Sequence, residues 1–259
     1  MSRSPVVAVI GLGEAGAAIA RDLVHAGCEV RGWDPAPRGD VRDVPRAVSA
    51  HEAVAGAEVI LSVNVAAVAR AVAQELLPAL AAGQLYADLN TAAPALKREL
   101  AALVEPAGAR FVDLALMAPV PGRGVRTPSL ASGSGARAFV ALFKPLGMPV
   151  SVVDEQPGSA AQRKLLRSVF MKGLAAAVIE SLQAASRAGC EAWMREEIAR
   201  QLASADEALL DRLVEGSRKH ALRRTEEMQA AAELLRDLQV EPRVSLAALG
   251  WLQSFLPPR

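Results

Sequence analysis

The chain has 259 residues, 52% of them apolar, and a formal net charge of +1. This length suffices for one large or two ordinary domains, and so balanced a charge gives no electrostatic reason to expect nucleic acid or a membrane surface as a partner. Cys28 and Cys190 lie far apart without CxxC spacing, which indicates reduced thiols in a cytoplasmic protein and neither a disulfide nor a metal site. We expect no signal peptide and no membrane span, because the apolar runs are too short for either.

Short apolar runs alternate with helical patterns through the first half of the chain. The predicted strands are Val6–Ile10, Glu29–Trp33, Glu58–Val63, Leu85–Leu89, Phe111–Leu116, Leu130–Ser132 and Val150–Val153. The predicted helices between them are Ala15–Ala26, Ala66–Leu80, Pro94–Val104 and Ala136–Phe143. This alternation predicts an α/β fold with a doubly wound parallel sheet and helices on both faces.

Strand signals end after Asp154, and the rest of the chain is rich in Ala, Leu, Glu and Arg, which are good helix formers. This composition predicts helices over 159–187, 191–204, 206–215, 217–238 and 245–254. We therefore expect an α/β domain over residues 1–156, followed by an all-helical domain over residues 157–259 that supplies substrate and dimer contacts.

A glycine-rich turn joins the first predicted strand to the first predicted helix. In "VVAVIGLGEAG", Gly11, Gly13 and Gly16 form a G-x-G-x-x-G pattern. The first glycine permits a tight turn, the second lets a pyrophosphate approach the backbone, and the third allows close packing of helix on strand. The pattern predicts a Rossmann dinucleotide site, with the cofactor held by the turn residues Gly11, Leu12, Gly13, Glu14, Ala15 and Gly16.

An acidic residue ends the second predicted strand, where it would meet the adenosine ribose. Asp34 follows Gly16 by 18 residues, and a carboxylate there accepts hydrogen bonds from ribose hydroxyls and repels a 2′-phosphate. We therefore predict NAD as the cofactor. NADP is the alternative, since Arg31 and Arg38 lie nearby and an arginine can hold a 2′-phosphate, although such arginines are more often solvated surface charges.

Polar side chains end the third and fourth predicted strands. Asn64 follows one strand, and Asn90 and Thr91 follow the next. Ligands of open α/β sheets bind at the carboxyl ends of strands, so we expect these three residues beside the nicotinamide. The alternative is that each is a helix cap or a turn residue.

The order of these motifs resembles the β-hydroxyacid dehydrogenase superfamily, which includes 3-hydroxyisobutyrate and 6-phosphogluconate dehydrogenases. "GLGEAG" matches the family's GLGxMG turn, and "DLNTAAP" matches its D-x-S-T-x-x-P segment with Asn90 at the serine. "DLALMAPVPG" matches the D-x-P-V-S-G-G substrate segment loosely, with Met117 where the serine would stand. Gly158 precedes Lys164 by six residues, as in the family, and Ser168 replaces the family's asparagine. The helical half is similar to a shorter branch with a compact, uncharacterised C-terminal domain.

The resemblance implies that Lys164 is the general acid/base of a hydride transfer and that Ser168 assists it. The two residues lie on one stripe of the predicted helix, with Lys172 to one side. An alternative is a lysine that extends to solvent and a serine that bonds to its own helix. For the substrate we also consider Met117, Arg123, Lys172 and His220. Arginines in such loops and a lone histidine are more often solvated.

Three functions fit these patterns. The first is an NAD(P)-dependent dehydrogenase or reductase that acts on a small hydroxy acid or on its aldehyde or keto form. The second is an imine reductase on the same scaffold, and the third is a non-catalytic dinucleotide sensor, which would not need Lys164. The small, apolar helical half and the resemblance together predict a homodimer or a larger assembly.

Overall fold

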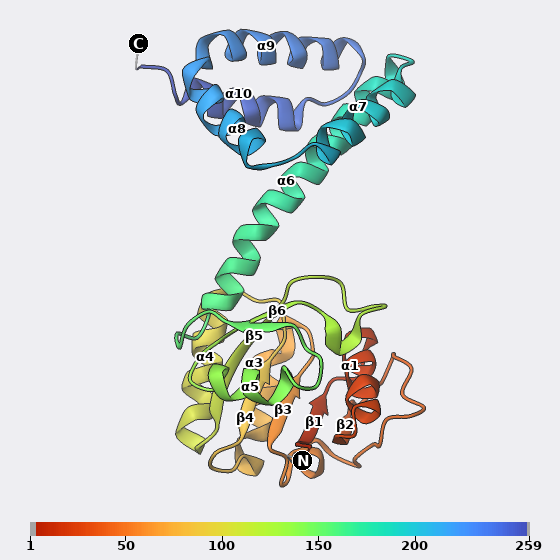
Figure 1. Cartoon of the computed structure of the whole chain (residues 1–259), viewed down its shortest axis with the longest axis vertical. Coiled ribbons are helices and arrows are strands. Elements are labelled where there is room, and N and C mark those ends of the chain that lie inside the picture. The colour runs from red at the N-terminus through yellow and green to blue at the C-terminus, as the bar shows by residue number, and fades with distance from the viewer. Residues whose placement is uncertain (1–3, 258–259) are drawn as a thin grey trace. The chain divides into compact units, whose positions relative to one another are not determined.

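The computed structural model describes residues 4–257 and contains two compact units, Met1–Arg167 and Ser168–Arg259 (Figure 1). The first unit holds a seven-stranded sheet in the order β2-β1-β3-β4-β5-β6-β7. Its strands are β1 (Val6–Ile10), β2 (Glu29–Trp33), β3 (Val59–Ser62), β4 (Leu85–Asp88), β5 (Arg110–Leu116), β6 (Ser129–Ser132) and β7 (Val150–Val152). Neighbouring strands are parallel except β5 and β6. The predicted fold class is confirmed, and the sheet departs from the predicted parallel arrangement at β6, which runs antiparallel to β5.

The reversal at β6 follows from the connection before it, which carries no crossover helix. After β5 the chain makes a loop whose only regular element is one 3₁₀ turn, Gly124–Arg126. A parallel return would need a crossover that carries the chain back along the sheet, usually as an α-helix. The loop instead folds back, and the Met117 N–H donates to the Pro128 carbonyl at 2.7 Å.

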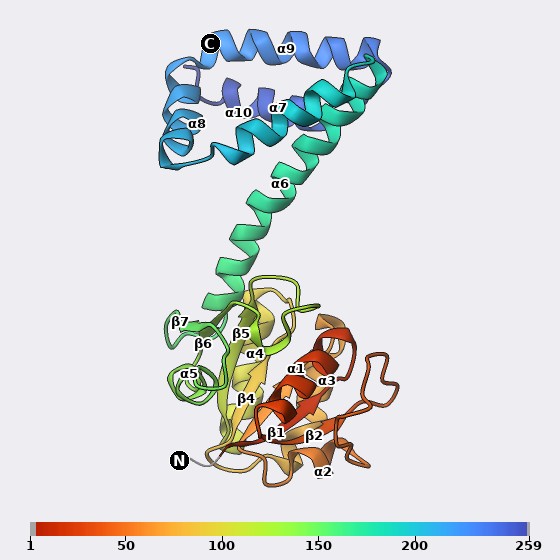
Figure 2. The same cartoon turned by 45° about the vertical axis from the view of Figure 1, so that its right-hand side comes forward.

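Helices cover both faces of the sheet, as the alternating side chains of its strands require. Val7 and Val9 of β1 pack with α1 (Glu14–His25) and α5 (Ala136–Phe143) on one face. Ala8 and Ile10 face the other way, against α2 (Ala50–Val54), α3 (Ala66–Leu76) and α4 (Pro94–Val104). Figure 2 shows these helices around the strands. The five-residue α2 was not predicted, and α3 was predicted to extend to Leu80, where the structure has a 3₁₀ turn, Leu77–Ala79, that contains Pro78.

The helix α6 (Ser159–Arg187) begins in the first unit, and the division into compact units falls inside it, after Arg167. The predicted boundary lies earlier, at residue 156. The first turn of α6 belongs to the first unit because its backbone N–H groups bond to the sheet: Ala160 N–H donates to Ser132 Oγ at 3.0 Å, and Ala161 N–H donates to Asp113 Oδ2 at 2.8 Å.

The second unit consists of the rest of α6 with α7 (Glu191–Ala203), α8 (Glu207–Lys219), α9 (Ala221–Asp237) and α10 (Arg243–Gln253). The break between α8 and α9 lies at His220, four residues later than the predicted break at 216. Gly216 continues the helix and leaves room for the Arg224 side chain of α9. Arg224 Nη1 donates to Ser217 Oγ at 2.6 Å, which ties the two helices together.

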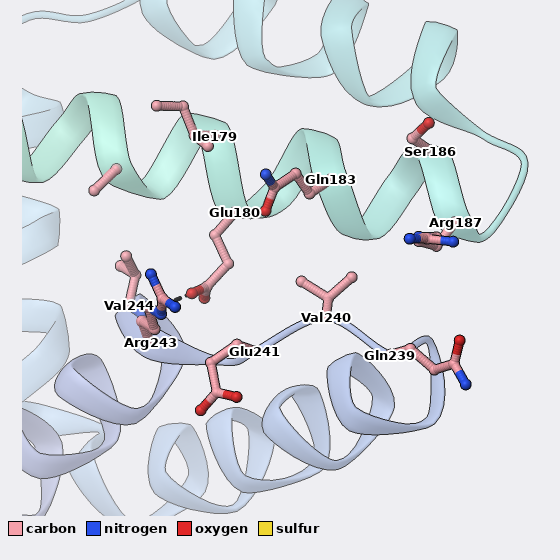
Figure 3. A pocket seen from close by; sticks show the side chains of 11 residues that line it. Ile179, Glu180, Gln183, Ser186, Arg187, Gln239, Val240, Glu241, Arg243 and Val244 are labelled. Atoms are coloured by element: carbon pink, nitrogen blue, oxygen red, sulfur yellow. Dashed lines mark hydrogen bonds between the residues drawn. The ribbon is translucent and has the colours of Figure 1, made fainter.

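A buried carboxylate caps α10 in the second unit. Glu180 of α6 is 8% exposed and accepts hydrogen bonds from the N–H groups of Val244 and Ser245 and from the Ser245 hydroxyl, at 2.7–2.8 Å. Figure 3 shows Glu180 reaching toward Val244 and Arg243. Burial alone would raise the pKa of Glu180, but these hydrogen bonds outweigh it and lower the pKa below its ordinary value of 4.5. The ionised carboxylate is therefore the stabilising form.

We expect Glu180→Ala to lower the free energy of unfolding of the second unit by about 2–3 kcal/mol, because it removes hydrogen bonds to a charged group and leaves buried donors unpaired. The control is Glu226→Ala, at an exposed position of α9 in the same unit, which should change the free energy of unfolding by less than about 0.5 kcal/mol. Since the folded pKa of Glu180 is lowered, its contribution is present above the ordinary pKa and is lost as the pH falls through the folded pKa. Denaturant unfolding at neutral and acidic pH measures both effects. Equal losses at the two pH values would contradict this account.

No helix among residues 4–257 is long and apolar enough to cross a membrane. Within the same residues, no group of three or more His, Cys, Asp or Glu side chains is arranged to hold a metal ion.

Candidate active site

The three glycines of the β1–α1 turn differ in their surroundings. Gly11 has φ +103°, and a side chain there would collide with the Val63 carbonyl at the end of β3. A side chain at Gly16 would collide with the Gly11 carbonyl, so this position holds α1 close against the turn. The space beside Gly13 is open, because a methyl group on its Cα would meet no atom within 4 Å. Open space above the middle glycine is what a pyrophosphate requires, so the turn fits a dinucleotide.

The remaining turn residues present backbone rather than side-chain groups. Leu12 is fully buried, and α1 begins at Glu14, so the N–H groups of Glu14, Ala15 and Gly16 belong to the first turn of a helix. Such N–H groups lack intrahelical acceptors and attract anions. Their binding to a cofactor remains a prediction.

Asp34 lies directly beside this turn. Its Oδ2 accepts the Leu12 N–H at 2.7 Å, and its Oδ1 accepts the Ala36 N–H at 2.8 Å. Each carboxylate oxygen retains a further lone pair for a ribose hydroxyl. Arg31 pairs with Glu29 and donates to the Ala55 carbonyl, so its guanidinium is engaged on the sheet edge. Arg38 is exposed in the following loop.

The ends of β3 and β4 are joined through their asparagines. The Asn64 N–H donates to Asn90 Oδ1 at 2.6 Å, and Asn64 Nδ2 donates to Ser62 Oγ at 3.0 Å. Asn90 is buried and also donates to Asp88, whereas Thr91 is exposed beside it. The predicted residues are thus brought together. The side chains of both asparagines take part in fixing the edge, and the hydroxyl of Thr91 lies at its surface.

Lys164 reaches this edge from α6. Its Nζ donates to Thr91 Oγ1 at 2.8 Å, although the two residues are 73 positions apart in the chain. Lys164, Thr91, Asn90, Asp113 and Ala161 line one small pocket of the first unit. The catalytic role of Lys164 remains a prediction.

Gly158 explains how α6 comes so near. It has φ +99°, and a side chain there would lie 2.8 Å from the carbonyl oxygen of Pro94 at the start of α4. Glycine adopts this conformation without a steric cost and lets the starts of α4 and α6 approach. The six-residue spacing from Gly158 to Lys164 therefore places the ammonium at a fixed distance along the helix from this contact.

A buried ion network lies beneath Lys164. Lys97 of α4 is 1% exposed, and its Nζ lies 2.6 Å from Asp88 Oδ2 and 3.1 Å from Asp113 Oδ1, both residues being fully buried. Burial raises the pKa of Asp88, and the Lys97 ammonium opposes that rise. Lys97 was not among the residues predicted from the sequence. The available signal was its place on α4, in register with the buried Leu100, Ala101 and Val104.

Of the other candidate residues in the first unit, neither Met117 nor Arg123 lines this pocket. Met117 is half-buried at the end of β5, and Arg123 is exposed in the loop that follows. That loop is held over α1, where Asp22 Oδ2 accepts the Val125 N–H at 2.9 Å. Ser168, Lys172 and His220 belong to the second unit. Lys172 and His220 are exposed within it, and the roles of all three remain predictions.

Two family matches cover most of the chain. Residues 6–127 match the NAD binding domain of 6-phosphogluconate dehydrogenase, and residues 185–255 match a domain of unknown function (DUF1932). A probable 3-hydroxyisobutyrate dehydrogenase from Mycobacterium tuberculosis is 28% identical over 194 residues, which are 72% of this chain and 66% of that protein. The matched regions span between 39% and 66% of the length of the curated relatives.

Solved structures share the fold over nearly the whole chain. A conserved protein of unknown function, described as similar to 3-hydroxyacid dehydrogenases, is 28% identical with a TM-score of 0.64, over 96% of this chain and 97% of its own. An imine reductase from Streptomyces aurantiacus has a TM-score of 0.80 at 20% identity, over 96% and 93%. A reductive aminase from Aspergillus terreus, solved with NADPH, has a TM-score of 0.80 at 19% identity, over 97% and 93%. The resemblance to the hydroxyacid dehydrogenase superfamily is confirmed.

Proposed function

Because the chain carries an NAD-binding domain of the 6-phosphogluconate dehydrogenase family, we propose that it is an NAD(P)-dependent oxidoreductase of small hydroxy acids or their aldehyde or keto forms. Lys164 is the general acid/base of this reaction. The observation that carries the proposal is the 2.8 Å hydrogen bond from Lys164 Nζ to Thr91 Oγ1. It puts an amine at the carboxyl edge of the sheet, where ligands of open α/β sheets bind.

Different residues of the first unit would bind the cofactor and transfer the proton. The glycine turn and the start of α1 would hold the pyrophosphate, and Asp34 would hold the ribose. The cofactor supplies the chemistry of accepting or giving a hydride at its nicotinamide. In alcohol oxidation, the neutral amine of Lys164 takes the hydroxyl proton as the hydride leaves the carbon. In carbonyl reduction, the Lys164 ammonium returns that proton to the oxygen. Thr91 orients the Lys164 amine.

This function is tested by a screen of both cofactors against small hydroxy acids, their oxidised forms and imines. Turnover is monitored through the absorbance of the reduced nicotinamide. Turnover of hydroxy acids supports the proposal. Turnover of imines alone would establish the second candidate, whose scaffold is shared over nearly the whole chain. Cofactor binding without turnover of any compound would identify a sensor.

We expect NAD to bind at least about tenfold more tightly than NADP, a difference of about 1.4 kcal/mol. Asp34 stands beside the glycine turn, and its carboxylate would repel a 2′-phosphate. Calorimetric titration of both cofactors measures the ratio of the affinities for NAD and NADP. Asp34→Asn, which keeps the size of the side chain and removes its charge, should reduce this ratio. Tighter binding of NADP would overturn the prediction and direct attention to Arg38.

We also propose that the protein is a homodimer, because the helices of the second unit leave large apolar side chains uncovered. None of the described residues of α7 or α8 is buried within the chain. Trp251, Phe170 and Leu222 of the same unit are 71%, 65% and 64% exposed. Apolar surface on this scale is typical of a subunit interface. Light scattering should give the mass of two chains, and Leu213→Glu on α8 should lower it. A monomeric wild type at micromolar concentration would contradict the proposal.

We further propose a cytoplasmic location, since Cys28 and Cys190 are both free thiols and free thiols persist in a reducing compartment.

A further inference from the structure

The first turn of α6 is a buried helix start whose N–H groups need acceptors from elsewhere. Ala160 and Ala161 are buried, and the first N–H groups of any helix have no intrahelical partner. Side chains of the sheet supply the acceptors: Ser132 Oγ for Ala160 at 3.0 Å, and Asp113 Oδ2 for Ala161 at 2.8 Å. Ser132 Oγ–H also donates to Asp113 Oδ2 at 3.3 Å. The start of α6 is thus fixed to β5 and β6 by two side chains.

The carboxylate of Asp113 is in turn held by Lys97. The Lys97 ammonium lies 3.1 Å from Asp113 Oδ1 and 2.6 Å from Asp88 Oδ2, and it donates to the Asp88 carbonyl at 2.9 Å. With both carboxylates ionised, the three groups carry a formal net charge of −1. The partial positive charge of about +0.5 at the start of α6 offsets part of it. The Lys97 ammonium therefore links two sets of interactions, one through Asp88 and one through Asp113, which we call the Asp88 arm and the Asp113 arm.

The two arms lead to different parts of the candidate site. Through Asp88, the network bonds to Asn90 and from there to the Asn64 N–H, at the ends of β3 and β4. Through Asp113, it bonds to Ala161, which lies three residues, less than one helical turn, before Lys164. The Asp88 arm borders the place predicted for the nicotinamide, and the Asp113 arm borders the amine.

We propose that Asp113 is a positioning residue that fixes the first turn of α6 and thereby holds Lys164 at Thr91, with Lys97 as the cation that keeps Asp113 in place. This inference rests on the proposed role of Lys164. It adds that the two arms have separate effects. Loss of the Asp113 arm displaces the Lys164 amine, whereas loss of the Asp88 arm weakens binding of the cofactor. Misplacement by about 1 Å can cost 10²-fold in rate.

The experiment compares Asp113→Leu with Asp88→Leu, two variants that make the same change in charge. Each removes one carboxylate of the network and leaves Lys97 paired with the other. The readout is the rate at which acetic anhydride modifies Lys164, measured by peptide mass spectrometry, with Lys172 on the same helix as the internal control. Cofactor affinity is measured in parallel by calorimetric titration of NAD.

The variant that lacks Asp113 should show several-fold faster modification of Lys164, unchanged modification of Lys172 and unchanged affinity for NAD. The variant that lacks Asp88 should show weaker affinity for NAD and unchanged modification of Lys164. Equal changes in the two variants would overturn the proposal, since a merely structural network would not separate them. The modification rate needs no turnover, so failure of this inference is distinguished from failure of the proposed reaction.

A milder pair of variants protects the test if either Asp113→Leu or Asp88→Leu does not fold. Ser132→Ala removes the acceptor of the Ala160 N–H, whereas Ser129→Ala on the same strand removes only a hydrogen bond to the Thr127 carbonyl. Faster modification of Lys164 in Ser132→Ala alone supports the anchoring of α6. Unchanged modification in Ser132→Ala would overturn it.

Discussion

Replacing Lys164 with alanine is expected to lower kcat by roughly 10²–10⁴-fold, the usual contribution of a positioned proton-transfer group. The reason is geometric: the Lys164 amine is held at Thr91 Oγ1, 2.8 Å away, at the edge of the sheet where the glycine turn also lies. Affinity for the cofactor should change little, because the turn and Asp34, which we expect to bind most of it, belong to other elements than α6. Steady-state kinetics on the substrate found by the screen, with calorimetry of NAD binding, measures both quantities.

The matched control is Arg163→Ala, the exposed preceding residue of α6. It should leave kcat within about twofold, since surface substitutions away from a site are nearly neutral. If Lys164 only covered the helix surface, its loss would change stability by about 1 kcal/mol and leave the rate alone. A Lys164→Ala enzyme with the wild-type rate would therefore exclude the acid/base role.

Replacing Lys97 with methionine is expected to lower the free energy of unfolding of the first unit by about 3–5 kcal/mol. The variant keeps the volume of the side chain but leaves Asp88 and Asp113 buried without their shared cation. Denaturant unfolding, followed through the fluorescence of Trp33 in strand β2, gives the loss. Arg98→Met, at the exposed neighbouring position of α4, should change stability by less than about 0.5 kcal/mol.

The loss in Lys97→Met should also depend on pH. Burial already raises the pKa of Asp88 in the wild type, and removing the ammonium that opposes this raises it further. A carboxyl whose folded pKa is raised stabilises the fold below its unfolded pKa, and this contribution is lost as the pH rises through the folded pKa. The free energy of unfolding that Lys97→Met loses relative to wild type should therefore be smaller in mildly acidic than in mildly alkaline buffer. A deficit independent of pH would show that the carboxylates do not carry the effect.

Local patterns were enough to predict most of the fold. Alternation and β-branched residues identified all seven strands within a residue or so, and the helix Ser159–Arg187 was predicted to the residue. The reversal of β6 was missed because strand direction depends on the loop after Leu116, which carries no periodic signal. The break between α8 and α9 was predicted at Gly216 because glycine is common at helix ends. Here Gly216 continues α8 and makes room for Arg224.

The candidate site was predictable where a backbone constraint marks it. A side chain at Gly11, Gly16 or Gly158 would collide with nearby backbone. Each of these glycines also has a recognisable spacing to the other residues of its motif. Lys97 could not be found in this way, because an isolated lysine on a helix is ordinarily solvated. Its partners, Asp88 and Asp113, come from two different strands, and only the folded sheet brings them to the same ammonium.

The decisive measurement is the reduction of NAD by a panel of small hydroxy acids. We predict that at least one hydroxy acid reduces NAD, that the matching acid without the hydroxyl does not, and that Lys164→Ala abolishes most of the rate while still binding NAD. Reduction of the cofactor that is equally fast in wild type and Lys164→Ala would contradict it, as would turnover confined to imines.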